Sequence, residues 1–156
     1  METNFVPLSV TAHMLPDMVR AVVERIAEAS PRLAALVTPQ GSIKIDPLLM
    51  ALEPVLSPFG VTPGGGTGFA PTQIHFTGTG GRIGVSLQTG RAIANNGTLV
   101  SVLAAASSPD IDWIIAVVPE IYKSSKVYRN VLDQLQELQG AHGIYLDLQG
   151  VILVSY

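Results

Sequence analysis

The side chains that usually carry enzymatic chemistry are few in this chain and widely separated. It contains three histidines, His13, His75 and His142, and no cysteine. No pair of histidines has the spacing of a zinc site, and the lack of cysteine excludes a thiol nucleophile and thiolate-bound metal. The sequence also lacks the motifs of a nucleophile elbow, a phosphate-binding P-loop, a zinc protease and a dinucleotide-binding fold. The common enzyme templates therefore do not apply.

One polar pattern lies on a segment that reads as a strand, residues 82–88 (RIGVSLQ). Its apolar residues alternate with small or polar ones, so Ser86 and Gln88 share one face. Residues 72–77 (TQIHFT) alternate in the same way, and glycines separate the two segments. This pattern predicts a β-hairpin that presents a row of polar side chains.

From this hairpin onward the order of elements resembles that of the BglII/BstYI-like restriction endonucleases, which belong to the PD-(D/E)XK nuclease superfamily. The resemblance is carried by RIGVSLQTGRA, a helix, DIDWIIAVVP, KVYRNVLDQL and a closing apolar strand. In that family the hairpin strand carries Glu-x-Gln followed by glycine, and two carboxylates on neighbouring strands hold a divalent cation. The resemblance implies a Mg²⁺-dependent type II endodeoxyribonuclease that acts on double-stranded DNA as a homodimer.

Carried onto this chain, the family's glutamine is Gln88, but both metal-binding carboxylates are replaced. The glutamate position is Ser86, and the aspartate position on the preceding strand is Thr77. Neutral hydroxyls do not supply the charge that holds Mg²⁺ against its hydration shell. The resemblance therefore predicts a degenerate catalytic site at Thr77, Ser86 and Gln88, with no cofactor expected, and Mg²⁺ as the cofactor if the chain is active.

Acids elsewhere in the chain would have to replace these ligands in an active enzyme. The candidates are Asp46 and Glu53 on the second expected helix and Asp112 at the start of a central strand. Three hypotheses follow: an inactive nuclease-like protein that binds DNA or protein, an active endonuclease with relocated ligands, and an α/β interaction protein unrelated to nucleic acid. The third stays open because a fold alone does not determine function.

Five basic residues are the candidates for contact with DNA phosphates. They are Arg82, Arg91, Lys123, Lys126 and Arg129. The chain has 9 basic and 12 acidic residues, so its net charge of −3 weakly repels nucleic acid. Binding to DNA therefore requires a local basic patch, which is densest at residues 123–129.

The composition is that of a folded domain with a large core. Of the 156 residues, 47% are hydrophobic and 13% are charged, which excludes a disordered chain and suits a single domain over residues 1–156. No apolar run approaches the roughly 20 residues of a membrane span, and the first residues do not resemble a secretory signal. We therefore expect a cytoplasmic protein without a membrane partner.

The elements that position the candidate site follow from hydrophobic periodicity. A glycine-rich loop at 61–68 divides a helical half from a strand–helix–strand half. The predicted helices cover residues 17–30, 46–55, 91–106 and 126–138, and residues 31–36 can form a further turn after the first helix. The predicted strands cover 72–77, 82–88 and 112–118, followed by one or two closing strands over 143–147 and 151–155. This order predicts an α/β fold with a restriction-endonuclease-like mixed sheet sandwiched by helices. The helix at 91–106 has no charge after Arg91, which favours a homodimer surface or burial.

Overall fold

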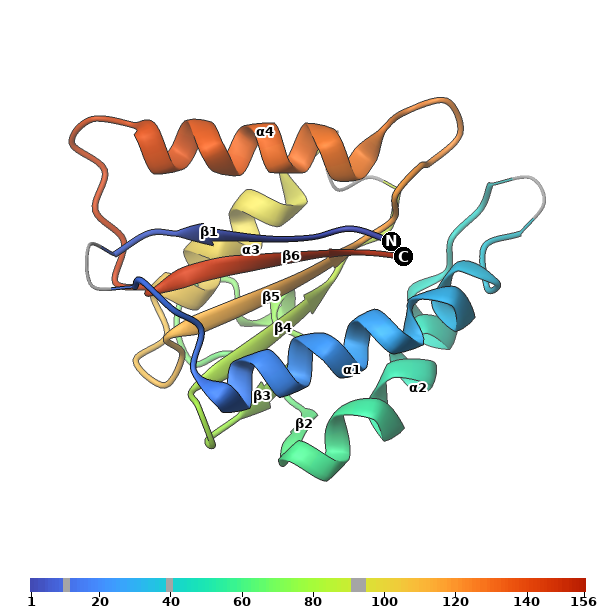
Figure 1. Ribbon diagram of the computed structural model, residues 1–156, viewed down its shortest axis with the longest axis horizontal. Coiled ribbons are helices and arrows are strands. Elements are labelled where there is room, and N and C mark those ends of the chain that lie inside the picture. Colours follow the sequence, from blue (N-terminus) through green and yellow to red (C-terminus); the bar gives the residue numbers. More distant parts are fainter. Residues whose placement is uncertain (10–11, 39–40, 91–94) are drawn as a thin grey trace.

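The computed structural model describes residues 1–9, 12–38, 41–90 and 95–156. Over these ranges the chain forms a six-stranded sheet with helices on both faces (Figure 1). The strands are β1 (Thr3–Pro7), β2 (Val61–Pro63), β3 (Phe76–Gly78), β4 (Ile83–Leu87), β5 (Trp113–Val118) and β6 (Gly150–Ser155). The helices are α1 (Asp17–Ala34), α2 (Ile45–Leu56), α3 (Gly97–Ala106) and α4 (Val127–Gly140), with short 3₁₀ turns at Ser57–Phe59 and Pro71–Gln73.

The sheet is mixed, in the order β1-β6-β5-β4-β3-β2. Strands β4, β5 and β6 are parallel neighbours, whereas β1 pairs antiparallel with β6, and β2, β3 and β4 pair antiparallel. Helices α3 and α4 make the crossovers that parallel neighbours require. Every residue of β5 is buried, as its continuous apolar sequence predicts for a central strand.

Two apolar cores lie on the two faces of the sheet. Helices α1 and α2 pack on one face, and α3 and α4 pack on the other (Figure 1). In β4, Val85 and Leu87 belong to the core beneath α1 and α2. Because successive strand residues point to opposite faces, Gly84 and Ser86 face α3. None of the helices in the described ranges is long and apolar enough to span a bilayer.

Helix α1 does not end at Ser30, so the prediction that the first helix stops there is wrong, and the further turn expected after Pro31 is part of the same helix. The helix continues through Pro31 to Ala34. Proline lacks the N–H that would bond the carbonyl four residues earlier, so one hydrogen bond of the helix is missing at Pro31, yet the helix continues for one more turn. Ser30 also donates a hydrogen bond of 2.7 Å to the carbonyl of Ser155, which fixes this turn against the sheet.

The sheet also contains a strand at residues 3–7 that is not predicted from the sequence. Strand β1 pairs with β6 from the far end of the chain, and so short a segment gives no periodic signal of its own. Of the one or two closing strands expected over 143–147 and 151–155, only β6 forms, and it lies between β5 and β1. The first part of the helix predicted at 91–106 lies outside the described residues, and α3 begins at Gly97.

The glycine-rich segment at 61–68 is only partly a loop. Its first three residues form the edge strand β2, paired with β3. The glycines that follow lie directly against the end of α3, where Gly68 N donates to Ser108 Oγ at 3.2 Å and Phe69 N donates to Ser107 Oγ at 2.8 Å. A Cβ atom at Gly68 would overlap the backbone carbonyl of Ser107. Glycine is needed here for close approach of two backbones.

This packing predicts the effect of adding one methyl group. Gly68→Ala should lower the free energy of unfolding by about 1–3 kcal/mol, because the backbone of Ser107 cannot move away cheaply. Gly140→Ala is the matched control, since nothing lies within 4 Å of a Cβ at that helical position. The control should be neutral or stabilising by up to about 1 kcal/mol. Urea denaturation measures both, and equal stabilities would contradict the packing.

Candidate functional site

The hairpin brings the three predicted site positions onto one face of the sheet. Thr77 lies directly opposite Gly84 in the antiparallel register of β3 and β4. Residues opposite each other share a face, so Thr77 is a diagonal neighbour of Ser86, and Gln88 extends the same row. The grouping of these three positions, expected from the sequence, is present in the structure.

Gln88 and Ser86 form a buried hydrogen-bond network with Ser101 of α3. The Gln88 amide Nε2 donates to Ser86 Oγ at 2.6 Å and to Ser101 Oγ at 2.8 Å. The two hydroxyl oxygens are themselves 2.8 Å apart. Ser86 and Ser101 are fully buried, and Gln88 is 8% exposed. The sequence reading missed Ser101, whose only signal is a polar residue within an apolar helix.

Both serine hydroxyl protons are donated in hydrogen bonds of this network. Ser101 Oγ donates to the carbonyl of Gly97 at 2.9 Å, so the single hydroxyl proton of Ser86 goes to Ser101. The amide nitrogen of Gln88 donates to both serines. Ser101 Oγ therefore has no free lone pair, and neither serine has a free proton. These residues do not fit Mg²⁺, which needs hard, charged oxygen ligands.

The main chain at this site is anchored from two further directions. Tyr156 Oη donates to the carbonyl of Gln88 at 2.8 Å, and burial raises the pKa of Tyr156, so it remains a donor. His75 Nδ1 accepts a 3.0 Å hydrogen bond from the backbone N–H of Leu87. Burial lowers the pKa of His75, which keeps its ring neutral and suited to accept that bond. His75 thus fixes the end of β4.

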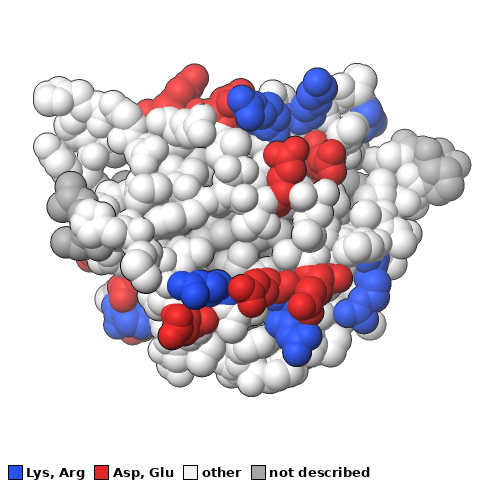
Figure 2. Space-filling view, viewed as in Figure 1, with Lys and Arg blue, Asp and Glu red and all other residues white. Residues whose placement is uncertain are grey.

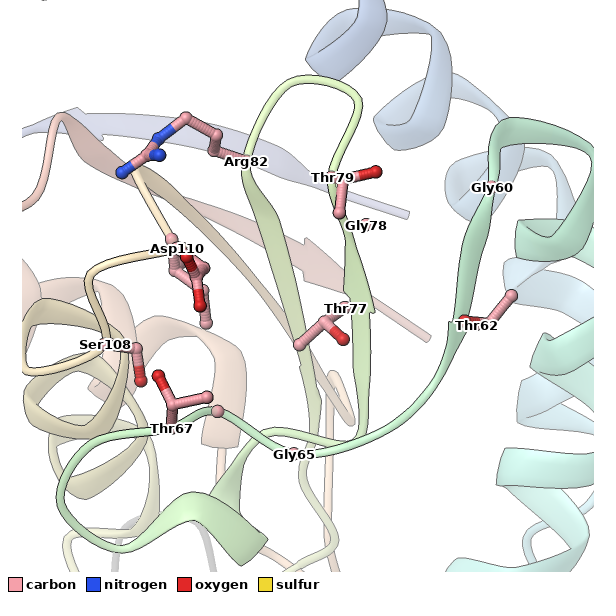
Figure 3. Close-up of a pocket in the computed structure, with 12 residues that line it drawn as sticks. Gly60, Thr62, Gly65, Thr67, Thr77, Gly78, Thr79, Arg82, Ser108 and Asp110 are labelled. Atoms are coloured by element: carbon pink, nitrogen blue, oxygen red, sulfur yellow. The ribbon is translucent and has the colours of Figure 1, made fainter.

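Thr77 faces a separate hollow of about 420 Å³ beside the hairpin. The glycine-rich segment forms one wall, and the residues after α3 form another (Figure 3). Figure 3 shows Thr67, Ser108 and Asp110 directed into this space opposite β3. Asp110 is a carboxylate near Thr77 that the sequence reading missed, because it follows α3 in a loop and belongs to no strand pattern.

The acids considered as relocated metal ligands are not brought together. Asp46 and Glu53 lie on α2, which packs on the opposite face of the sheet from Ser86. Asp112 precedes β5, whereas Gln88 is level with the end of that strand, about 20 Å away along it. Across the described ranges there is no group of three or more histidine, aspartate or glutamate side chains that could hold a metal ion.

Of the two arginines that flank β4, the structure describes Arg82 but not Arg91. Arg82 Nε donates to Asp112 Oδ2 at 2.7 Å, and its guanidinium also bonds the carbonyl of Pro109. This carboxylate, through its hydrogen bond and its charge, raises the pKa of Arg82. The guanidinium of Arg82 is therefore largely occupied by hydrogen bonds to other groups of the protein. Arg91 lies outside the described residues.

The basic residues at 123–129 gather at the start of α4 but share this surface with acids. Lys126 and Arg129 line a hollow of about 370 Å³ together with Glu2 and Glu120. Figure 2 shows positive and negative groups side by side over α4, and a second mixed row over α1. This mixture leaves a weaker field than the sequence cluster alone suggests.

Individual cations of the cluster also have their own partners. Arg129 Nε lies 3.5 Å from Asp133 Oδ1, one helical turn away. Lys123 Nζ lies 5.5 Å from the centre of the Tyr122 ring. Both contacts are on the surface, so each contributes less than about 1 kcal/mol and can be exchanged for a ligand.

Comparison with known proteins adds no family assignment. No protein-family model, curated protein or solved structure matches this chain.

The neutral His75 predicts a pH-dependent stability. A folded-state pKa below the ordinary 6.5 means that the unfolded chain binds more protons, so the stabilisation is complete above pH 6.5 and declines as the pH falls below it. Chemical denaturation from about pH 7 to about pH 5 should show this loss in the wild type. His75→Asn, which keeps an acceptor, should lose less over the same range.

His142→Asn is the control for this experiment, because His142 is exposed. It should keep the pH dependence of the wild type. A His75→Asn protein with the same dependence as the wild type would contradict a neutral, buried role for His75.

Proposed function

We propose that this chain is a restriction-endonuclease-like protein that no longer cleaves DNA and acts by binding another protein. The observation that carries the proposal is the closed network of Ser86, Gln88 and Ser101. It occupies the positions at which the resemblance places a metal carboxylate and its neighbouring glutamine. A site whose hydroxyls and amide bond one another does not bind or orient a metal and water for phosphodiester hydrolysis.

The arrangement of elements supports the restriction-endonuclease-like part of the proposal. The β3–β4 hairpin is followed by α3, the central strand β5, α4 and the closing strand β6, which is the order that the resemblance implies. The two N-terminal helices cover the opposite face of the same sheet. The hairpin register also places Thr77 and Ser86 as neighbours, as two ligands of one metal would need to be.

The distribution of charge favours a protein partner over duplex DNA. The net charge is −3, Arg82 is bonded to Asp112, and acids adjoin the basic cluster at the start of α4. A surface on which acids and bases adjoin can pair with a protein surface that carries both signs of charge. Affinity for DNA instead grows with the number of phosphates that the protein neutralises, and the adjoining acids oppose this. Duplex DNA is the second candidate, favoured by Lys123, Lys126 and Arg129.

We also propose that the protein forms a homodimer, as the resemblance implies. In α3, which has no charged residue, most side chains pack on the sheet, and burial accounts for much of its apolar character. Leu103 remains 46% exposed on that helix. Sedimentation of the purified chain measures the oligomeric state.

The proposal predicts no cleavage of DNA in the presence of divalent cations. Supercoiled plasmid of mixed sequence, incubated with the protein and either Mg²⁺ or Mn²⁺, should remain uncut. Nicking that disappears in Asp46→Ala, Glu53→Ala or Asp112→Ala would instead establish an active enzyme with relocated ligands. A mobility shift at low salt that weakens steeply as salt rises would favour DNA over a protein partner.

Restoring the two carboxylates tests the nuclease-like geometry itself. The double variant Thr77→Asp/Ser86→Glu should be less stable than the wild type, because Ser86 is fully buried. Millimolar Mg²⁺ should then stabilise this variant by about 1–3 kcal/mol and leave the wild type unchanged. Thr77→Asn/Ser86→Gln is the neutral control of similar shape. Equal effects of Mg²⁺ on the two double variants would contradict the restriction-endonuclease-like assignment.

A further inference from the structure

We propose that the hollow beside β3 binds a neutral ligand with neighbouring hydroxyl groups, either a monosaccharide or the ribose of a nucleoside. This site is separate from the network of Ser86 and Gln88, and the inference does not depend on the proposed function. It rests on the unpaired polar groups, the charge and the shape of the hollow (Figure 3).

The polar groups around the hollow are free to bind a ligand. Within the described part of the chain, the hydroxyls of Thr67 and Thr77 and the carboxylate of Asp110 line the hollow without a side-chain hydrogen bond to another protein group, although the charge of Asp110 acts on Arg82. Ser108 Oγ donates to the carbonyl of Ala104 at 2.9 Å and accepts from Gly68, which leaves one lone pair. The walls thus offer two groups that donate or accept and two that only accept.

Hydroxyl groups of a ligand match this set. A sugar hydroxyl both donates and accepts, so one hydroxyl can donate to Asp110 while a neighbouring one accepts from Thr67 or Thr77. A bond to a carboxylate is stronger than one between neutral groups, which makes Asp110 the main anchor. Ser108 can accept from a further hydroxyl.

The charge of the hollow disfavours an anion. Arg82 lines its rim, but this guanidinium is bonded to Asp112 and to the carbonyl of Pro109. The charge of Asp110 also acts on Arg82 and raises the pKa of that guanidinium. Arg82 is therefore shared between two carboxylates and a carbonyl, and the described lining residues include no second cation, so a phosphate group beside Asp110 would be repelled. A neutral ligand avoids this cost.

The shape of the hollow suits a sugar more than a flat aromatic ring. Gly65 and Gly66 leave the wall formed by the glycine-rich segment without side chains, so a ligand can approach the backbone. Ile111 provides an apolar surface for the C–H face of a sugar ring. The lining residues include no aromatic side chain on which a base would stack. The volume of about 420 Å³ lies within the range of small-molecule sites.

Titration of the ¹⁵N-labelled chain followed by two-dimensional NMR tests this inference. The probes are glucose, galactose, mannose, ribose, adenosine, 2′-deoxyadenosine and inorganic phosphate. The concentration of each probe is increased to about 20 mM, so that binding with a dissociation constant in the millimolar range is detected. At least one neutral sugar or adenosine should give saturable shifts centred on Thr67, Thr77 and Asp110. Binding of adenosine but not of its deoxy form would assign the ligand as a ribose, and binding of the hexoses would assign a monosaccharide.

Two variants and two matched controls localise the binding. Thr77→Val and Asp110→Asn each remove one recognition group with little change in volume, and each should weaken binding at least about tenfold. Thr72→Val and Asp17→Asn, at exposed positions outside the hollow, should leave it unchanged. Circular dichroism confirms that each variant is folded. The inference is overturned if no neutral probe gives saturable shifts, if both variants bind like the wild type, or if phosphate binds more tightly than every sugar.

Discussion

The hydrogen-bond network of Gln88, Ser86 and Ser101 is the constraint on which the central part of this structure depends. It joins the end of β4 to α3 inside an otherwise apolar layer. Buried polar groups are tolerated only when they are paired, and leaving one unpaired costs about 1–3 kcal/mol. Three groups that satisfy one another therefore fix the position of α3 on the sheet. The same closure removes them from chemistry.

On the surface, charged side chains of opposite sign also lie close to one another. Acids and bases lie side by side over α1, and over α4 the basic residues at its start adjoin acids (Figure 2). Arg82 and Asp112 neutralise each other at the beginning of β5. Among the described residues, the mixed surface at the start of α4 and the hydroxyl-lined hollow beside β3 are both open to a partner or ligand.

Much of the fold could be predicted from the sequence because its signals are local. The alternation around Ser86 predicts the hairpin, the apolar run of β5 predicts a central strand, and helices α1, α2 and α4 follow their periodicity. Strand β1 could not be predicted, since its five residues become a strand only by pairing with β6 at the other end of the chain. The glycines after β2 similarly reveal their role only when they are seen against the end of α3.

The candidate site could be predicted only in part, for the same reason. Spacing along two strands is enough to place Thr77, Ser86 and Gln88 on one face. Ser101 and Asp110 come from elements that follow in the sequence and join the site through tertiary packing, so no strand pattern identifies them. The distance between Asp112 and Gln88 is likewise set by the parallel pairing of β4 with β5.

We propose that Ser86, Gln88 and Ser101 hydrogen-bond one another and do not bind a divalent metal ion. The most direct measurement is a titration of the ¹⁵N-labelled wild type with Mn²⁺, whose unpaired electrons broaden the signals of nearby nuclei. Because Ser86 and Gln88 bond one another, we expect no saturable broadening at the amides of Thr77, Ser86 and Gln88. Saturable broadening centred on these three residues, reversed by excess Mg²⁺, would contradict it.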